Sequence, residues 1–367
     1  MSKKSFLLLV IVILSVAFLS ARPIAAGKAY LHHQISVTID PGNHFLEAVD
    51  TITVPISCKT DSLEFSLLSD LEPRLLSSGA SLILVEEGVQ GEDTGMDREE
   101  SPDASSMSLS RYLIVFGKSR DRDIELIIEL KGKVYFPIEG PGREYARGFS
   151  QTPGLISDQG VYLAGSTFWV PDFDGEFITF EMTVSMPDGW DVVSQGGRTF
   201  HGKVGSEGGT DRRITRWTSL DPMEEIFLIA ARFHEYTLQA GDVEVMAFLR
   251  TPDEALAGKY LETTGQYLEM YCGLLGDYPF SKFALIENFW ETGYGMPSFT
   301  LLGEKVIRFP FILHSSYPHE LLHNWWGNSV YVDFEGGNWC EGLTTYMADH
   351  LIKEQRGQGL QYRRNTL

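Results

Sequence analysis

The chain has 367 residues and a formal net charge of -20, with 30 basic residues against 50 acidic ones. Such an acidic surface repels nucleic acid, so we exclude DNA and RNA as partners. Hydrophobic residues make up 43% of the chain and aromatic residues 12%, which indicates packed cores and leaves room for two or three domains. Three cysteines are too few for a disulfide framework.

The first residues have the order of a targeting segment. Two lysines precede an apolar run over residues 6–19, and small residues follow it up to Ala26. This charged, apolar, small order is typical of a secretory signal, and the run is shorter than the roughly 20 residues of a membrane-spanning helix. We therefore predict a signal peptide or N-terminal anchor over residues 1–26, with the rest of the chain secreted or otherwise outside the cytoplasm. Any membrane attachment is expected through this segment only.

Residues 27–248 have the pattern of an all-β domain. Apolar and polar residues alternate in short runs separated by Gly, Pro and Asp, and helical periods are scarce. Strands are predicted over 34–39, 112–116, 124–130, 177–184 and 213–218. Three aromatic residues, Tyr162, Phe168 and Trp169, either line a ligand cleft at the domain junction or pack in the core, and core packing is expected for at least two of them.

The pattern changes after residue 248. Residues 255–275 have a helical apolar period bounded by Pro252 and Gly276. Two short strands are predicted over 283–289 and 299–302, followed by two helices. This order predicts a second domain of α+β type over residues 249–367.

The run His319-Glu320-Leu321-Leu322-His323 carries the clearest chemical proposal. Two histidines four residues apart lie on one face of a helix, at the spacing that chelates a zinc ion, and the glutamate between them can take a proton from water. Pro318 suits the first turn of such a helix, and Gly327 is expected to end it. The alternative is an incidental histidine pair. The sequence therefore predicts Zn²⁺ as cofactor, with His319 and His323 as ligands and Glu320 as the catalytic base.

Glu341 is the candidate for the third ligand. It stands near the start of a second amphipathic helix, and a helix holds a ligand more rigidly than a loop. Asp333 and Glu335, in the intervening loop, are rival ligands. Cys340 is also near, but adjacent helical residues point about 100° apart, so Cys340 and Glu341 are not expected to face one ion together. Thr344 could steady a ligand, although a threonine on the helix surface is the simpler expectation.

These residues resemble the M1 aminopeptidases, zinc enzymes of the gluzincin type. The resemblance extends beyond the zinc motif, in the same order along the chain, to residues 30–41, 177–190 and 271–280. It implies an all-β N-terminal domain followed by an α+β thermolysin-like zinc metallopeptidase domain. It also implies a peptide substrate and a metal site made of His319, His323 and Glu341, with Glu320 as the base.

Two departures from the family concern the site itself. Seventeen residues separate His323 from Glu341, where the family usually has eighteen. The family's Gly-x-Met-Glu-Asn strand, whose glutamate binds the substrate amine, is matched by a segment in which Pro297 and Ser298 replace the glutamate and asparagine. Because proline lacks an N–H, this strand is predicted at a sheet edge, where it can pair with an extended substrate. Its candidate substrate-binding residues are Gly293, Tyr294, Gly295, Met296 and Pro297, and Glu287 or Glu291 could replace the missing anion.

A third departure lies downstream. The chain stops at Leu367, before the family's oxyanion-binding tyrosine and C-terminal helical domain, so a fragment or truncated reading frame is expected. Loss of an oxyanion donor costs two to three orders of magnitude in rate. We predict a zinc-dependent metallopeptidase of uncertain aminopeptidase specificity. The alternatives are a zinc-binding, catalytically weak peptide-binding module and a hydrolase of a non-peptide bond.

Overall fold

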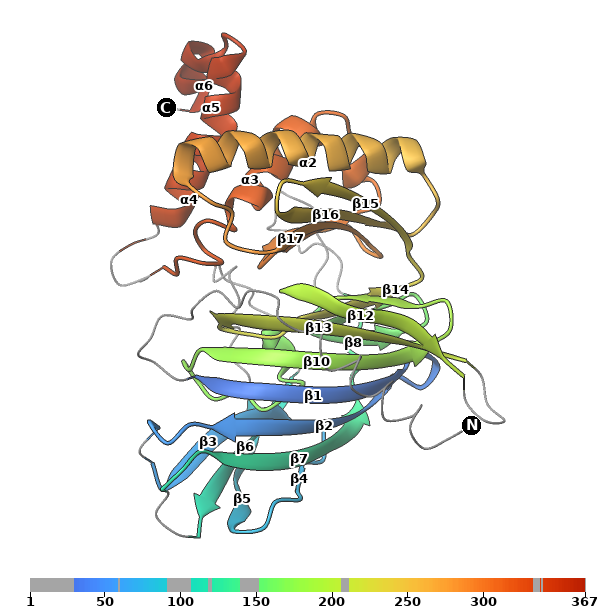
Figure 1. Cartoon of the computed structure of the whole chain (residues 1–367), viewed down its shortest axis with the longest axis vertical. Helices are drawn as coiled ribbons and strands as arrows, with labels where there is room; N and C mark the ends of the chain where they lie inside the picture. The colour runs from blue at the N-terminus through green and yellow to red at the C-terminus, as the bar shows by residue number, and fades with distance from the viewer. Residues whose placement is uncertain are drawn as a thin grey trace, which may run out of the picture.

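The computed structural model describes residues 30–58, 60–90, 107–117, 121–138, 152–205, 211–332, 337 and 339–366. The predicted signal or anchor over 1–26 lies outside these residues, as do the rival ligands Asp333 and Glu335. The fold is mostly β, with several sheets and few helices (Figure 1). In the described part of the chain, no helix combines the length and the apolar character needed to cross a membrane.

The largest sheet has seven strands in the order β12-β13-β10-β1-β2-β7-β4. β1 pairs in parallel with β10 and antiparallel with β2, and its residues alternate between buried and exposed, as its sequence pattern predicts. Four of the predicted strands fall on β1, β7, β10 and β13. The bounds are β1 Leu31–Asp40, β2 Phe45–Val54, β4 Arg74–Leu75, β7 Ile124–Lys133, β10 Ile178–Pro187, β12 Gly197–Val204 and β13 Arg212–Met223.

Two smaller sheets complete the N-terminal half. One has the order β3-β6-β5 and the other β11-β14-β9-β8. The predicted strand over 112–116 falls on β6. The bounds are β3 Ser62–Leu68, β5 Ala80–Gln90, β6 Ser108–Phe116, β8 Gly154–Ser157, β9 Gly160–Leu163, β11 Asp191–Val193 and β14 Leu228–Ala231.

The second half is built on a five-stranded sheet in the order β15-β16-β17-β19-β18, with the long helix α2 (Glu254–Leu275) lying across its face away from the N-terminal sheets (Figure 1). The predicted helix and its two following strands agree with α2, β17 and β19 to within one residue at each end. β15 and all of β16 except its last residue precede residue 249 yet belong to this sheet, and a domain boundary at 248/249 stays a prediction. The bounds are β15 His234–Ala240, β16 Val243–Leu249, β17 Lys282–Asn288, β18 Gly293–Met296 and β19 Phe299–Gly303.

Aromatic rings join the two halves. Tyr162 of β9 packs edge-on against Trp290 with ring centroids 5.2 Å apart, and Phe227 packs edge-on against Phe299 at 5.8 Å. Trp169 is fully buried and donates its indole N–H to the carbonyl of Ile226 at 3.0 Å. Phe168 and Trp169 therefore serve the core, as expected for two of the three aromatic residues, and Tyr162 lies at the junction.

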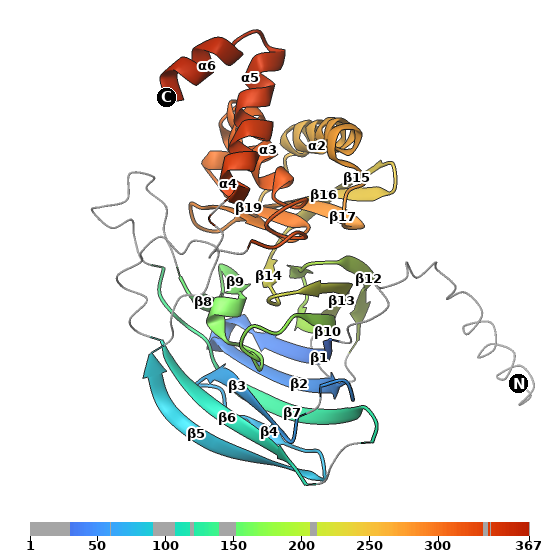
Figure 2. The same cartoon turned by 90° about the vertical axis from the view of Figure 1, so that its left-hand side faces the viewer.

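Helical segments follow the sheet and stand apart from the N-terminal half (Figure 2). Two short 3₁₀ helices, η3 (Val306–Arg308) and η4 (Ile312–His314), come first. They are followed by α3 (Ser316–Leu322) and α4 (Trp339–Thr344), which carry the predicted zinc motif and the predicted third ligand. The π-helical segment η6 (Thr345–His350) continues α4, and α5 (Leu351–Gln355) and α6 (Gly359–Thr366) end the described chain.

Candidate metal centre and substrate edge

Helix α3 is held in place by its apolar face. Tyr317 is 1% exposed; its ring packs edge-on against Tyr260 of α2, with centroids 4.8 Å apart, and its hydroxyl hydrogen-bonds to Thr264. Leu321 and Leu322 are fully buried on the same face. The opposite face of α3, which carries His319 and Glu320, is only partly buried.

The helix ends earlier than the sequence predicts. α3 stops at Leu322 rather than at Gly327, because the N–H groups of Asn324 and Trp325 donate to the carbonyls of Leu321 and Leu322 in tighter turns. His323 is the C-cap, and its N–H still donates to the carbonyl of His319 at 3.3 Å. The two histidines therefore keep the one-turn spacing on which the prediction depends.

Helix α4 is tied to the end of α3 by a hydrogen bond between side chains. Trp326 donates its indole N–H to the hydroxyl of Thr344 at 2.7 Å, and that hydroxyl donates to the carbonyl of Cys340 at 2.9 Å. Thr344 is fully buried, so the expectation of a threonine on the helix surface is wrong. The bond fixes the turn after His323 relative to the first turn of α4, where Glu341 lies.

The three predicted ligands converge. His319 Nε2 lies 3.3 Å from Glu341 Oε2, and His323 Nε2 lies 3.3 Å from Glu341 Oε1. One ligand atom from each residue falls within 4.8 Å of the others, and within the described residues this is the one group of three or more His, Cys, Asp or Glu side chains that could hold a metal ion. Glu341 is 55% exposed, so the centre opens to solvent on that side.

The Nδ1 atoms of the two histidines, which point away from Glu341, have different partners. His319 Nδ1 lies 3.5 Å from Asp349 Oδ2, and His323 Nδ1 lies 3.5 Å from Cys340 Sγ. Cys340 thus lies behind His323, while Glu341 faces its other nitrogen, in agreement with the angular argument. An uninterrupted α-helix would turn Asp349 roughly 80° away from Glu341. The π-helical winding of η6 turns less per residue, which brings Asp349 back toward His319.

The surroundings act on the two histidines in opposite directions. Burial lowers the pKa of His319, but the hydrogen bonds that its ring N–H groups donate to Asp349 and Glu341 outweigh burial and raise that pKa to about 10. Burial and the charge of His319 lower the pKa of His323 to about 4. Two imidazoles and a carboxylate are a donor set that zinc takes in catalytic sites, so the residues present fit the predicted ion.

The predicted substrate strand lies beside the base. β18 is the edge of its sheet, which confirms the prediction made from Pro297. A Cβ built on Gly295 would lie 2.6 Å from Glu320 Oε2 and 3.4 Å from the Glu320 carbonyl oxygen. Gly293 and Tyr294 are partly buried, and Gly295, Met296 and Pro297 are buried. Glycine at position 295 is thus what allows β18 to approach α3 so closely.

Glu287 and Glu291, the suggested substitutes for the missing anion, already have other partners. Glu287 is 1% exposed; one oxygen accepts from Arg308 Nη1 at 2.5 Å and the other from the N–H of Arg250 at 2.7 Å. Glu291 Oε1 accepts from the N–H of Lys305 at 3.1 Å, while its buried Oε2 has no hydrogen-bond partner among the described residues. Neither residue is brought into the histidine cluster.

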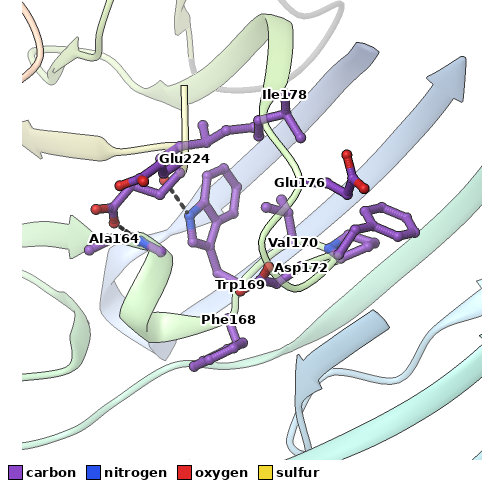
Figure 3. Close-up of a pocket in the computed structure, with 13 residues that line it drawn as sticks. Ala164, Phe168, Trp169, Val170, Asp172, Glu176, Ile178 and Glu224 are labelled. Carbon is purple, nitrogen blue, oxygen red and sulfur yellow. Dashed lines mark hydrogen bonds between the residues drawn. The ribbon is translucent and has the colours of Figure 1, made fainter. Parts of the chain in front are cut away.

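A second hollow lies in the N-terminal half. Trp169, Asp172 and Glu224 are among the side chains around it (Figure 3), and none of the lining residues belongs to the metal cluster. Its volume of about 30 Å³ has room for one or two ordered water molecules rather than for a substrate. The predicted ligand cleft at Phe168 and Trp169 is therefore a small pocket, which the exposed side chains of Glu176 and Glu224 also line.

The sequence alone missed three residues that contact the metal ligands, the zinc helix or the end of the predicted substrate strand: Asp349, Asn324 and Lys282. Asn324 directly follows the zinc motif, and Asp349 lies in the helical segment that continues α4, so both polar residues could have been examined for that reason. Lys282 gave no signal, because a lysine at the start of an apolar strand is normally exposed, whereas here it is 1% exposed.

Neither a scan against protein-family models nor a search of curated proteins finds a match. Solved structures do match. An M1 zinc metallopeptidase from Deinococcus radiodurans is 17% identical, with 90% of this chain and 71% of that chain covered and a TM-score of 0.59. A mutant of an M1 zinc metallopeptidase from Deinococcus radiodurans bound to the substrate Tyr-Ser-Ala is 16% identical, with 89% of this chain and 71% of that chain covered and a TM-score of 0.61. A mutant of a two-domain M1 zinc metallopeptidase bound to L-arginine is 17% identical, with 89% of this chain and 71% of that chain covered and a TM-score of 0.58. The chain thus has the fold of the M1 zinc metallopeptidases.

Proposed function

We propose that this protein is a zinc-dependent metallopeptidase that hydrolyses peptide bonds. The observation that carries the proposal is the convergence of His319 Nε2 and His323 Nε2 on the two oxygens of Glu341, each at 3.3 Å. In this proposal the three residues hold the ion, and β17–β19 with α3 and α4 form a thermolysin-like catalytic unit. The fold shared with the M1 structures supports it.

The proposed chemistry assigns a separate task to each residue. A bound zinc ion would polarise the scissile carbonyl and lower the pKa of water. Glu320, one residue after His319 and beside Gly295, would take a proton from the attacking water and deliver it to the leaving amine. Asp349 would accept a hydrogen bond from His319 Nδ1, which orients the ring so that Nε2 faces the ion.

The substrate would bind as an added strand. β18 is an edge strand, and an extended peptide can pair with such an edge through its main chain. The residues from Gly293 to Pro297 would therefore contact the substrate backbone next to Glu320. One M1 structure with this fold is bound to a tripeptide, which supports a peptide as the occupant.

We further propose that hydrolysis does not depend on a free amino terminus. Pro297 and Ser298 carry no charge, Glu287 is paired with Arg308, and Glu291 accepts from Lys305. Of the carboxylate oxygens of Glu287 and Glu291, only Glu291 Oε2 is left without a hydrogen-bond partner among the described residues, and that oxygen is buried, so none of these residues offers an exposed, unpaired carboxylate to a substrate ammonium.

We also propose that the protein lies outside the cytoplasm. This proposal rests on the composition of residues 1–26, and it can be tested by fusing that segment to a secretion reporter.

The test compares the purified protein with Glu320→Gln. Zinc content would be measured by mass spectrometry, and hydrolysis would be followed with quenched peptides carrying free or acetylated amino termini. We expect one zinc per chain in both proteins, hydrolysis of both peptide types by the wild type, and a loss of roughly 10²- to 10⁴-fold in the variant. Glu254→Gln, in the first turn of α2, is the matched control.

The outcomes separate the alternatives. Zinc binding without any hydrolysis that depends on Glu320 would leave a peptide-binding module or a hydrolase of another bond. Cleavage restricted to peptides with a free amine would reject the proposed indifference to the amino terminus while preserving the peptidase.

A further inference from the structure

All polar groups of Ser298, the residue directly after Pro297, form hydrogen bonds. Its N–H donates to Asn324 Oδ1 at 2.6 Å, and its carbonyl accepts from Lys282 Nζ at 3.0 Å and from the N–H of Ala284 at 3.1 Å. Lys282 Nζ also donates to the Ser298 hydroxyl at 2.8 Å. The residue has a φ of 67°, in the left-handed region that a serine rarely adopts. Such a conformation persists where the surroundings over-determine it.

Asn324 connects this residue to the zinc helix. It follows His323 directly, is fully buried, and donates from Nδ2 to the carbonyl of Leu321 at 2.9 Å and to that of Glu320 at 3.4 Å. Its other amide atom holds the N–H of Ser298. One side chain therefore spans from the backbone of the proposed base to the end of the proposed substrate strand.

Lys282 holds the same residue from the other side. Its ammonium lies 5.0 Å from the ring centroid of Trp217, which belongs to the N-terminal sheet, and 5.4 Å from that of Phe299. Burial lowers the pKa of Lys282 well below its usual range. A lysine with 1% exposure is costly to bury, and an apolar residue of similar length would fit the same aromatic surroundings.

We propose that Asn324 and Lys282 are positioning residues, which clamp Ser298 and thereby hold β18 at a fixed distance from Glu320. The proposal rests on the peptidase function proposed above. The contact to be maintained, between Gly295 and Glu320 Oε2, is only three residues from Ser298. A displacement of about 1 Å in an active site can cost about 100-fold in rate, so a small slip of this strand would be felt in the chemical step.

The test uses Asn324→Ala and Lys282→Met, with Asn328→Ala and Lys259→Met as controls. Asn328 is a buried asparagine of the same turn whose Nδ2 has no partner among the described residues, and Lys259 is exposed on α2. Zinc content, melting temperature, kcat and KM would be measured, together with hydrogen–deuterium exchange of the 293–298 segment.

We expect both test variants to keep one zinc per chain and to lose roughly 10- to 100-fold in kcat, with KM changed by less than about threefold. The Ser298 amide should exchange faster in Asn324→Ala. Lys282→Met should melt at the same or a higher temperature than the wild type while its kcat falls. A residue that served stability alone would not combine these two results.

Unchanged kcat in folded, zinc-loaded variants would overturn the proposal, as would a fall in kcat that only tracks loss of zinc or of melting temperature. If Asn324→Ala does not fold, Lys282→Met decides. If the wild type hydrolyses no peptide, the proposed function is rejected. The positioning role of Asn324 and Lys282 is then tested by hydrogen–deuterium exchange alone. Equal exchange rates of the Ser298 amide in the wild type and in Asn324→Ala would reject that role.

Discussion

Gly295 of the edge strand faces Glu320 of the zinc helix so closely that a Cβ on the glycine would lie 2.6 Å from Glu320 Oε2. The same Cβ would lie 3.4 Å from the Glu320 carbonyl oxygen and 3.5 Å from its Cα, so the helix backbone limits how closely β18 can approach α3. The proposed base and the proposed substrate strand are therefore in direct contact, and the absence of a side chain at position 295 is what permits it.

Gly295→Ala is expected to push the Glu320 carboxylate aside without disturbing the three metal ligands. We predict a loss of roughly 10- to 100-fold in kcat with zinc content unchanged, because displacing a catalytic group by about 1 Å has costs of this size. Steady-state kinetics and metal analysis of the variant check this. Gly258→Ala, where a Cβ meets nothing within 4 Å, is the control. Full activity in Gly295→Ala would show that Glu320 has room to move or is not the base.

The sequence predicted the parts of the site that depend on local spacing. His319 and His323 are one helical turn apart, and Pro297 marks a sheet edge, so both features follow from short-range geometry. The strands were predictable because their alternation matches the two faces of a sheet, as in β1. What joins these parts was not predictable, because Thr344 and Lys282 meet their partners only through folding.

The end of α3 and the π-helical winding after α4 also could not be predicted from local sequence signals. Gly327 carries the usual stop signal, yet the helix ends at Leu322 because backbone N–H groups three residues on take the last carbonyls. The sequence does not reveal a π-helix at 345–350 either, although that winding is what turns Asp349 toward His319. Hydrogen-bond register within a helix is a result of packing rather than of residue type.

The bond between Trp326 and Thr344 should govern metal affinity. Thr344→Val keeps the shape of the side chain but removes the acceptor, which leaves the indole N–H without its 2.7 Å partner and loosens α4 against the turn after His323. We predict about tenfold weaker zinc binding, measured by competition with a chromophoric chelator. Thr345→Val, one residue along, is the matched control. Equal affinities in the two variants would mean that Glu341 is held by other contacts.

Asp349 is expected to act through His319. Asp349→Asn keeps the size of the side chain but removes the charge that faces Nδ1 at 3.5 Å, so the ring loses the partner that fixes its orientation. We predict roughly 10- to 100-fold weaker zinc binding, as is usual when such a partner of a ligating histidine is lost. The same competition assay measures it.

Glu354→Gln serves as the control for Asp349→Asn, because Glu354 is 51% exposed and lies near His350 rather than near the metal ligands. A variant of Asp349 that binds zinc as tightly as the wild type would show that packing alone orients His319.

Asp172, beside the small pocket of the N-terminal half, should make stability depend on pH (Figure 3). Burial raises the pKa of its carboxyl to about 6 and Asp174 adds to the rise, while His33 opposes it. The value in the unfolded chain is near 4, so folding favours the protonated form. The stabilisation is complete below about pH 4 and is lost as the pH rises through 6, where the buried group must ionise.

Asp172→Asn stays neutral throughout. It should therefore melt at a higher temperature than the wild type at pH 7.5, and the gap should close toward pH 4. Asp158→Asn, at an exposed position, should show no such trend. A gap that stays constant with pH would place the effect in hydrogen bonding rather than in ionisation.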